Sequence, residues 1–73
     1  MDRDRVHLLD ILEAARLAVV YVEGISEEAF LHNTQLQDSV IRRIEIIGEA
    51  ARRVSQETRR TYPDIPWTKM IGM

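Results

Sequence analysis

The sequence predicts an all-α fold, an antiparallel helical bundle of two long helices and additional short ones. In two stretches, residues 2–23 and 36–60, apolar residues recur every three or four positions, which is the helical period. Both prolines lie beyond these stretches, so neither helix is interrupted by one. We expect the whole chain, residues 1–73, to form a single domain. Because a single core is marginal at this size, we expect dimerisation to complete the bundle.

The first long helix, predicted over residues 2–23, has a wide apolar band. Negative charge is favourable near a helix start, where Asp2 and Asp4 lie, and Gly24 predicts the helix end. The main apolar stripe and the residues that widen it are Val6, Leu9, Leu12, Val19 and Val22, then Leu8, Ile11, Ala15 and Ala18. A band this wide can face two neighbouring helices, so this helix needs more partners than the rest of the chain easily provides.

A short helix is predicted next, from Glu27 to about Leu31. Ser26 has the side chain and the position of its N-cap, and two glutamates follow in the first turn. The apolar residues of this helix, from Ala29 to Leu31, are expected to cover the open end of the pair of long helices.

The second long helix is predicted to continue unbroken to about Arg60. Thr34 and Gln37 fit the capping-box pattern at its start. Its apolar stripe consists of Leu36, Val40, Ile44, Ile47, Ala51 and Val54. This stripe must be buried against another element, and residues 1–33 supply the obvious partner.

The segment at residues 62–66 ends the long helix, because proline lacks an amide hydrogen and restricts the residue before it. Pro66 can occupy the first turn of a new helix, which Trp67 continues. Core packing with a bonded indole N–H is the favoured role of Trp67, and base stacking is the alternative. This segment reaches Met73 after about two turns with its apolar residues unpartnered, so we expect the domain to be C-terminally incomplete.

Composition excludes several classes of function. The chain has no cysteine, so it has no disulfide and no thiolate nucleophile or ligand. No apolar run approaches the roughly 18 residues of a transmembrane helix, and we expect a cytoplasmic protein without a membrane role. The three glycines are isolated, so no phosphate-binding loop exists, and His7 and His32 lie on different elements outside any zinc spacing. We therefore predict no metal and no cofactor.

Six of the ten basic residues form three arginine pairs in the second long helix, at residues 42–43, 52–53 and 59–60. Guanidinium groups suit phosphates, so RNA binding is one interpretation. The other is a solvated face with local ion pairs, in which Glu49 and Arg53 have the favourable i, i+4 order. The net charge of −2 is far from the basic balance of dedicated nucleic-acid binders.

A helical wheel places Arg42, Ile46, Glu49 and Arg53 opposite the apolar stripe of this helix. Ile46 would then be an exposed aliphatic side chain surrounded by charges. This arrangement is typical of a helix–helix contact between subunits, so these four residues are the candidates for a cleft or dimer face. Gly48 costs roughly 1 kcal/mol of helix stability relative to alanine, and either a close helix crossing or chance tolerance explains it.

Two stretches of the sequence resemble a known family. Residues 37–51 contain the word Ile-Gly-Glu-Ala, and residues 65–73 contain Ile-Pro-Trp followed by Ile-Gly-Met. Residues 9–14 and the turn over residues 24–30 also match. Over its whole length the chain resembles the HepT-like branch of the HEPN domains, the toxin half of HepT/MNT toxin–antitoxin modules.

The resemblance implies an all-α bundle that forms a homodimer and acts on RNA as a metal-independent ribonuclease. It also implies a nucleotidyltransferase-type antitoxin as partner, and an Arg-Asn-x-x-x-His motif directly after the Gly-Met word. The sequence stops at Met73, where this motif should begin, and His7, His32, Tyr21 and Tyr62 do not take its place. We therefore expect no catalytic residue in the chain, which we interpret as a truncated HepT-like toxin domain that is inactive as it stands.

Two alternatives to the ribonuclease interpretation stay open. One alternative is a non-catalytic module for dimerisation or antitoxin binding, which its wide apolar surface favours. The other is weak binding of RNA or nucleotides through the arginines, which requires them to be free of Glu45, Glu49 and Glu57.

Overall fold

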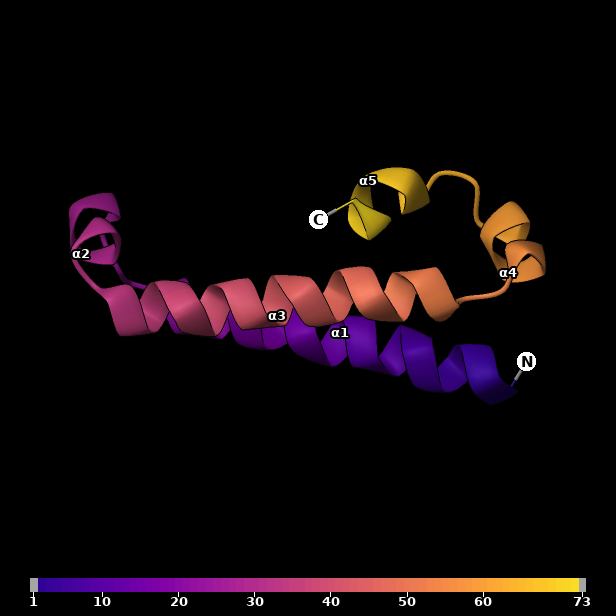
Figure 1. Cartoon of the computed structure of the whole chain (residues 1–73), viewed down its shortest axis with the longest axis horizontal. Coiled ribbons are helices and arrows are strands. Elements are labelled where there is room, and N and C mark those ends of the chain that lie inside the picture. Colours follow the sequence, from indigo (N-terminus) through magenta and orange to yellow (C-terminus); the bar gives the residue numbers. More distant parts are fainter. Residues whose placement is uncertain (1, 73) are drawn as a thin grey trace.

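Two long antiparallel helices, α1 (Asp2–Val22) and α3 (Thr34–Arg53), form the body of the molecule (Figure 1). The structure, a computed structural model, describes residues 2–72, and these contain helices but no strand. The short helix α2 (Glu27–Leu31) connects the long helices at one end. At the other end α4 (Gln56–Thr61) leads into α5 (Trp67–Ile71), which turns back over α3 (Figure 1). The predicted all-α fold with two long helices is confirmed.

Small residues line the contact between α1 and α3. Ala14 of α1 is buried, as are Ala50 and Ala51 of α3, and the larger Ile47 is buried beside them. Short side chains allow two helix backbones to approach closely, which extends the contact along both helices. The apolar stripe of α3 is therefore packed against α1 as predicted, with its N-terminal half only partly buried.

Trp67 anchors the C-terminal segment in the core. Its side chain is buried in a cluster with Ala51 and Val54, and α1 contributes the half-buried Leu8 and Ile11. The indole Nε1 donates a hydrogen bond to the carbonyl of Tyr62 at 3.0 Å, so the polar end of the ring is satisfied. The predicted core role is confirmed.

The prediction that the apolar residues of this C-terminal segment lack partners is wrong for the residues the structure describes. Met70 and Ile71 pack against the buried cluster around Trp67. Met73, the last residue of the predicted amphipathic segment, lies outside the described residues. The segment closes one end of the core because α4 and the loop after it reverse the chain direction.

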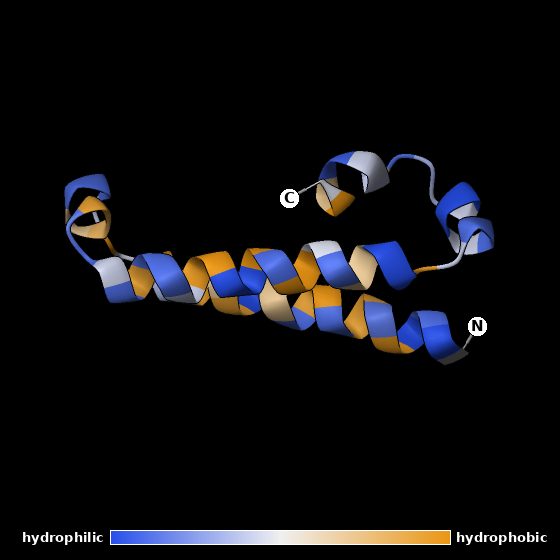
Figure 2. Ribbon diagram, viewed as in Figure 1, coloured by the Kyte–Doolittle hydropathy of each residue, from blue (hydrophilic) through white to orange (hydrophobic). Residues whose placement is uncertain are grey.

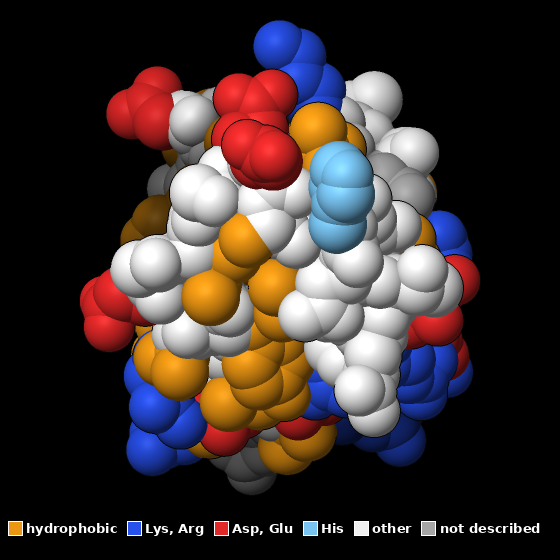
Figure 3. Space-filling model, turned by 90° about the vertical axis from the view of Figure 1, so that its left-hand side faces the viewer, with side chains coloured by type: hydrophobic (Ala, Val, Ile, Leu, Met, Phe, Trp, Pro, Cys, Tyr) orange, Lys and Arg blue, Asp and Glu red, His pale blue; other side chains and the backbone are white. Residues whose placement is uncertain are grey.

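At the other end, Ser26 caps α2 as predicted, and its hydroxyl oxygen accepts a hydrogen bond from the amide of Ala29 at 3.0 Å. The expectation that Ala29, Phe30 and Leu31 cover this end of the helix pair is mostly wrong. Only Phe30 is half-buried, whereas Leu31 is 63% exposed. Apolar side chains consequently lie open on this surface, between acidic groups and basic groups (Figure 3). Five residues are too few to reach across two long helices.

The start of α3 also differs from the predicted capping box. Asn33 is the N-cap, and its side-chain oxygen accepts a hydrogen bond from the amide of Leu36 at 2.9 Å. Gln37 instead donates its side-chain amide to the carbonyls of Phe30 and Leu31 at the end of α2. Gln37 therefore joins two helices and is not available to cap one.

The prediction of a single helix to Arg60 is wrong, because α3 ends at Arg53 and the chain is extended at Val54 and Ser55. In an unbroken helix the amide of Ser55 would donate to the carbonyl of Ala51. Here it donates to the carboxylate of Asp4 at 2.9 Å. The hydroxyl of Ser55 also donates to Asp4, at 2.6 Å, and its oxygen accepts from the amide of Thr58 as the N-cap of α4.

Asp4 is buried and accepts a third hydrogen bond from the hydroxyl of Thr58. The hydroxyl of Ser55, then that of Thr58 and the Ser55 amide, lower the pKa of Asp4 from 3.8 to about 2. The ionised carboxylate is the form that accepts all three bonds. Its contribution to stability is therefore fully present above pH 3.8 and is lost as the pH falls toward 2.

Replacing Asp4 by asparagine should lower the melting temperature at pH 7 by about 5 °C or more, because an amide oxygen cannot replace a carboxylate with three donors. The variant should also lose the part of the pH dependence that lies between pH 3.8 and 2. Thermal unfolding followed by circular dichroism over pH 2–7 measures both effects. Asp64→Asn, at an exposed position in the loop before α5, is the control. An Asp4→Asn curve parallel to that of the unmodified chain would contradict this role.

Candidate functional site

The predicted site residues lie along one side of α3, hereafter the outer face: Arg42, Ile46, Glu49 and Arg53. Arg42 and Glu49 line a shallow hollow of about 280 Å³. Ile46, Glu49 and Arg53 line a second hollow of about 170 Å³. Because Glu49 belongs to both hollows, the four residues form one continuous strip.

The environment of Ile46 differs from the prediction of a fully exposed side chain. Ile46 is half-buried and shares its hollow with His7 and Asp10 of α1. It therefore lies at the edge of the contact between α1 and α3, with charged groups on its open side. The helical wheel missed this because α1 covers a broader arc of α3 than the main stripe alone. Gly48 is buried on the same helix, which favours close packing over chance tolerance.

The electrostatics of the outer face centre on the predicted ion pair between Glu49 and Arg53. The guanidinium Nη2 lies 2.9 Å from the Glu49 carboxylate, and both side chains are exposed. Such an exposed i, i+4 pair contributes only about 0.3–0.5 kcal/mol. Its effect is to hold Arg53 along the helix, at the border of the hollow that contains Ile46.

The six arginines of this region have different structural roles. Arg59 of α4 reaches back and donates to the carbonyls of Ala51 and Arg52, at 3.0 and 2.9 Å, at the C-terminal end of α3. Arg52 donates to the carbonyl of Ile71 at 3.3 Å, which ties α5 to α3. Arg43 is half-buried, and its Nε has no hydrogen-bond partner within the described part of the chain. The set is therefore neither a uniform solvated face nor a continuous basic surface.

The two histidines lie at opposite ends of the helix pair. His7 is half-buried between α1 and α3, whereas His32 ends α2, where its Nδ1 lies 3.2 Å from the carbonyl of Glu28. Across residues 2–72, no three or more histidine, cysteine or acidic side chains gather as they would around a metal ion. No helix within residues 2–72 is both long enough and apolar enough to cross a membrane.

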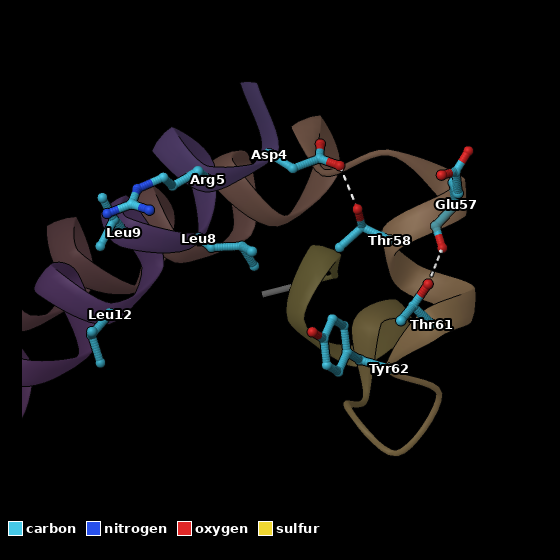
Figure 4. A pocket seen from close by; sticks show the side chains of 9 residues that line it. All are labelled: Asp4, Arg5, Leu8, Leu9, Leu12, Glu57, Thr58, Thr61 and Tyr62. Carbon is cyan, nitrogen blue, oxygen red and sulfur yellow. Dashed lines mark hydrogen bonds between the residues drawn. The ribbon is translucent and has the colours of Figure 1, made fainter. Parts of the chain in front are cut away.

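One sizeable apolar hollow was not predicted from the sequence. It lies between α1 and α4 and has a volume of about 530 Å³. Leu8 and Leu12 of α1 line one side and Tyr62, after α4, lines the other (Figure 4). Only the width of the apolar band on α1 signalled that such a surface could remain open.

Comparison with known proteins gives consistent results. A family model described as Ribonuclease HepT-like matches residues 11–73. "Putative RNase MJ1380" of Methanocaldococcus jannaschii is 36% identical over 69 residues, which are 94% of this chain and 63% of that protein. "Probable ribonuclease HepT" of Thermococcus cleftensis is 40% identical over 67 residues, 92% of this chain and 61% of that protein.

A third relative, "Gamma-glutamylcyclotransferase and putative RNase MJ0434" of Methanocaldococcus jannaschii, is 42% identical over 69 residues. The match covers 94% of this chain and 31% of that protein. The chain thus spans less than two thirds of the length of these three curated relatives. No solved structure matches the chain significantly.

The geometry of Arg59 leads to a stability prediction. Arg59→Ala should lower the free energy of unfolding by about 1–2 kcal/mol, because the two carbonyls at the end of α3 lose a charged donor. Urea denaturation followed by circular dichroism measures this change. Arg60→Ala, which removes the same charge from the exposed neighbour, should change stability by less than about 0.5 kcal/mol. Equal losses in the two variants would show that the carbonyl contacts are unimportant.

Proposed function

The chain belongs to the ribonuclease HepT-like family, and from this membership we propose that it is the helical scaffold of a HepT-type toxin whose activity is metal-independent cleavage of RNA. The family match over residues 11–73 is the observation that carries this proposal. Two relatives whose names refer to ribonuclease activity, at 36% and 40% identity, support it. The absence of cysteine is in keeping with a cytoplasmic protein.

The chemistry of the reaction determines what these residues can do. Cleavage of RNA without a metal needs a group that transfers a proton and a cation that stabilises the developing negative charge. The Arg-Asn-x-x-x-His motif expected for these roles does not occur in the sequence. His7 and His32 belong to separate ends of the helix pair, so neither forms a substitute with the other. We infer that residues 1–73 alone do not cleave RNA.

The outer face of α3 is the proposed dimer interface, with Arg42, Glu49 and Arg53 at its rim. The half-buried Ile46 offers an apolar centre within that charged rim. A nucleotidyltransferase-type antitoxin is the proposed further partner. The second candidate function, a non-catalytic module that binds such a partner, is favoured by the large apolar side chains that remain exposed on α1.

Purified residues 1–73 should leave labelled single-stranded RNA intact, with and without EDTA, because the acid–base motif is lacking. Gel electrophoresis of the RNA after incubation measures cleavage. Background nuclease is identified by testing Arg42→Ala and Glu49→Gln beside Arg60→Ala. Metal-independent cleavage that copurifies with the chain and disappears in the first two variants alone would overturn the inference.

The family activity itself is tested by the coding sequence that follows codon 73 in the source genome. An in-frame Arg-Asn-x-x-x-His motif directly after that codon is the expected result. A stop codon at that position would overturn the ribonuclease proposal for this protein. It would favour the non-catalytic binding module.

The dimer proposal is tested by charge reversal on the outer face. The double variant Arg42→Glu with Arg53→Glu should shift the chain from dimer to monomer at micromolar concentration, because the two acids would repel Glu49 across the interface. Size-exclusion chromatography with light scattering measures the mass. Arg60→Glu on α4 is the matched control and should stay dimeric. A monomeric unmodified chain would exclude this interface.

A further inference from the structure

Residues 56–72, hereafter the C-terminal arm, are held to the rest of the molecule in two different ways. At one end of the arm, α5 is anchored by Trp67, which is buried in the core cluster. At the other end, α4 is hydrophilic (Figure 2), and of its six residues only Thr58 is buried. Polar bonds hold α4 in place, from Thr58 to Asp4 and from Arg59 to the end of α3. An arm with one apolar anchor and a polar connection can detach as a unit.

The connection between α3 and the arm differs from a helix in only one angle at each of two residues. Val54 has φ −70° and ψ 135°, and Ser55 has φ −64° and ψ 154°. Both φ values are already those of an α-helix, in which ψ is about −42°. No proline or glycine occurs in residues 49–61, so rotation of these two ψ angles would join α3 and α4 into one helix. Val54 and Ser55 thus have the properties of a hinge.

The carbonyls at the end of α3 can be satisfied in either arrangement. Arg59 now donates to the carbonyls of Ala51 and Arg52, at 3.0 and 2.9 Å. In a continuous helix, backbone amides four residues further on would donate to the same two carbonyls. Around the hinge, the bonds from Ser55 to Asp4 are therefore what favours the bent arrangement.

A continuous helix would carry Trp67 away from its own core cluster. The indole Nε1 is bonded to the carbonyl of Tyr62 at 3.0 Å, so Trp67 stays beside the end of α4. In a continuous helix Tyr62 would lie eight residues beyond Val54, or about 12 Å along the axis at 1.5 Å per residue. Val54 and Ala51, together with two half-buried residues of α1, would then lose the ring that covers them. Exposure of this cluster is unfavourable unless a second arm covers it.

We propose that two copies of this chain exchange their C-terminal arms, with Val54 and Ser55 as the hinge. The arm of each copy would cover the core cluster of the other copy, with the contacts of Trp67 that the structure shows within one chain. Each copy leaves one cluster open and supplies one arm, so the exchange closes at two copies. A second copy is favoured as the partner because its arm already fits this cluster. The proposal does not rest on RNA cleavage or on the outer face of α3.

The test follows the arm by fluorescence energy transfer between copies, since the chain contains no cysteine and single labels can be introduced. One preparation of residues 1–73 carries a donor at Ile41→Cys on α3, and another carries an acceptor at Lys69→Cys on α5, both at exposed positions. The two are mixed at high concentration, warmed to the midpoint of unfolding, cooled and diluted. Exchanged pairs should keep their transfer after dilution, because separation requires both arms to detach again.

Variants of the hinge should change this persistent transfer in opposite directions. Ser55→Ala removes the hydroxyl that bonds to Asp4 and caps α4, so it should raise the transfer by about threefold or more. Gln56→Pro should abolish the transfer, because proline suits the first residue of α4 but breaks a continuous helix. Gln56→Ala is the matched control and should keep at least the transfer of the unmodified chain.

Three results would overturn the proposal: equal transfer in Gln56→Pro and Gln56→Ala, no persistent transfer even in Ser55→Ala, or loss of the transfer in Arg42→Glu. The last result would assign the contact to the outer face of α3. Circular dichroism should show unchanged helicity in Gln56→Pro, so that its loss of transfer reports the hinge and not unfolding. Ser55→Ala tests the hinge independently of that variant. Failure of the RNA-cleavage proposal would leave all these readouts unchanged.

Discussion

The carboxylate of Asp4 organises the second half of the chain. By accepting the amide and hydroxyl of Ser55 and the hydroxyl of Thr58, it ends α3 and starts α4 beside the first turns of α1. The end of α3 is then free to receive Arg59, and the reversed chain can return Trp67 to the cluster around Ala51. The hollow between α1 and α4 exists because α4 is held there. The buried carboxylate of Asp4, which accepts hydrogen bonds from Ser55 and Thr58, thus determines both the packing of the core and the hollow between α1 and α4.

Sequence periodicity was sufficient to predict α1, α2 and most of α3, because each has a strong apolar repeat or a recognisable cap. It could not predict the break at Val54 and Ser55. No proline or glycine lies there, and Ser55, a residue type common at helix N-caps, is the one local signal of a break. The break is imposed by an acceptor 51 residues away, which local propensity cannot report. The predicted capping box at the start of α3 was wrong for a related reason. Gln37 fitted a local capping pattern, but its side chain makes a hydrogen bond to α2.

The candidate site on α3 could be predicted from the sequence to about the same extent as the helices. The helical period placed Arg42, Glu49 and Arg53 on one side and anticipated the ion pair between the last two. It could not show that α1 partly covers Ile46, since the breadth of a packing contact depends on the partner helix. The stripe of α1 that looked most like a core face is the one most exposed to solvent. Periodicity gives the width of an apolar band, and only the arrangement of neighbours decides which half is covered.

The long separation between Asp4 and its donors has a consequence for biosynthesis. The first turn of α1 leaves the ribosome well before Ser55 and Thr58 have been made, so the helix hairpin of α1 and α3 can form while the acid is still solvated. Docking of α4 is then a closing step that joins the two ends of the hairpin. During the interval the nascent chain exposes the apolar side of α1 along its whole length. The period before α4 docks is therefore when this chain most needs a chaperone.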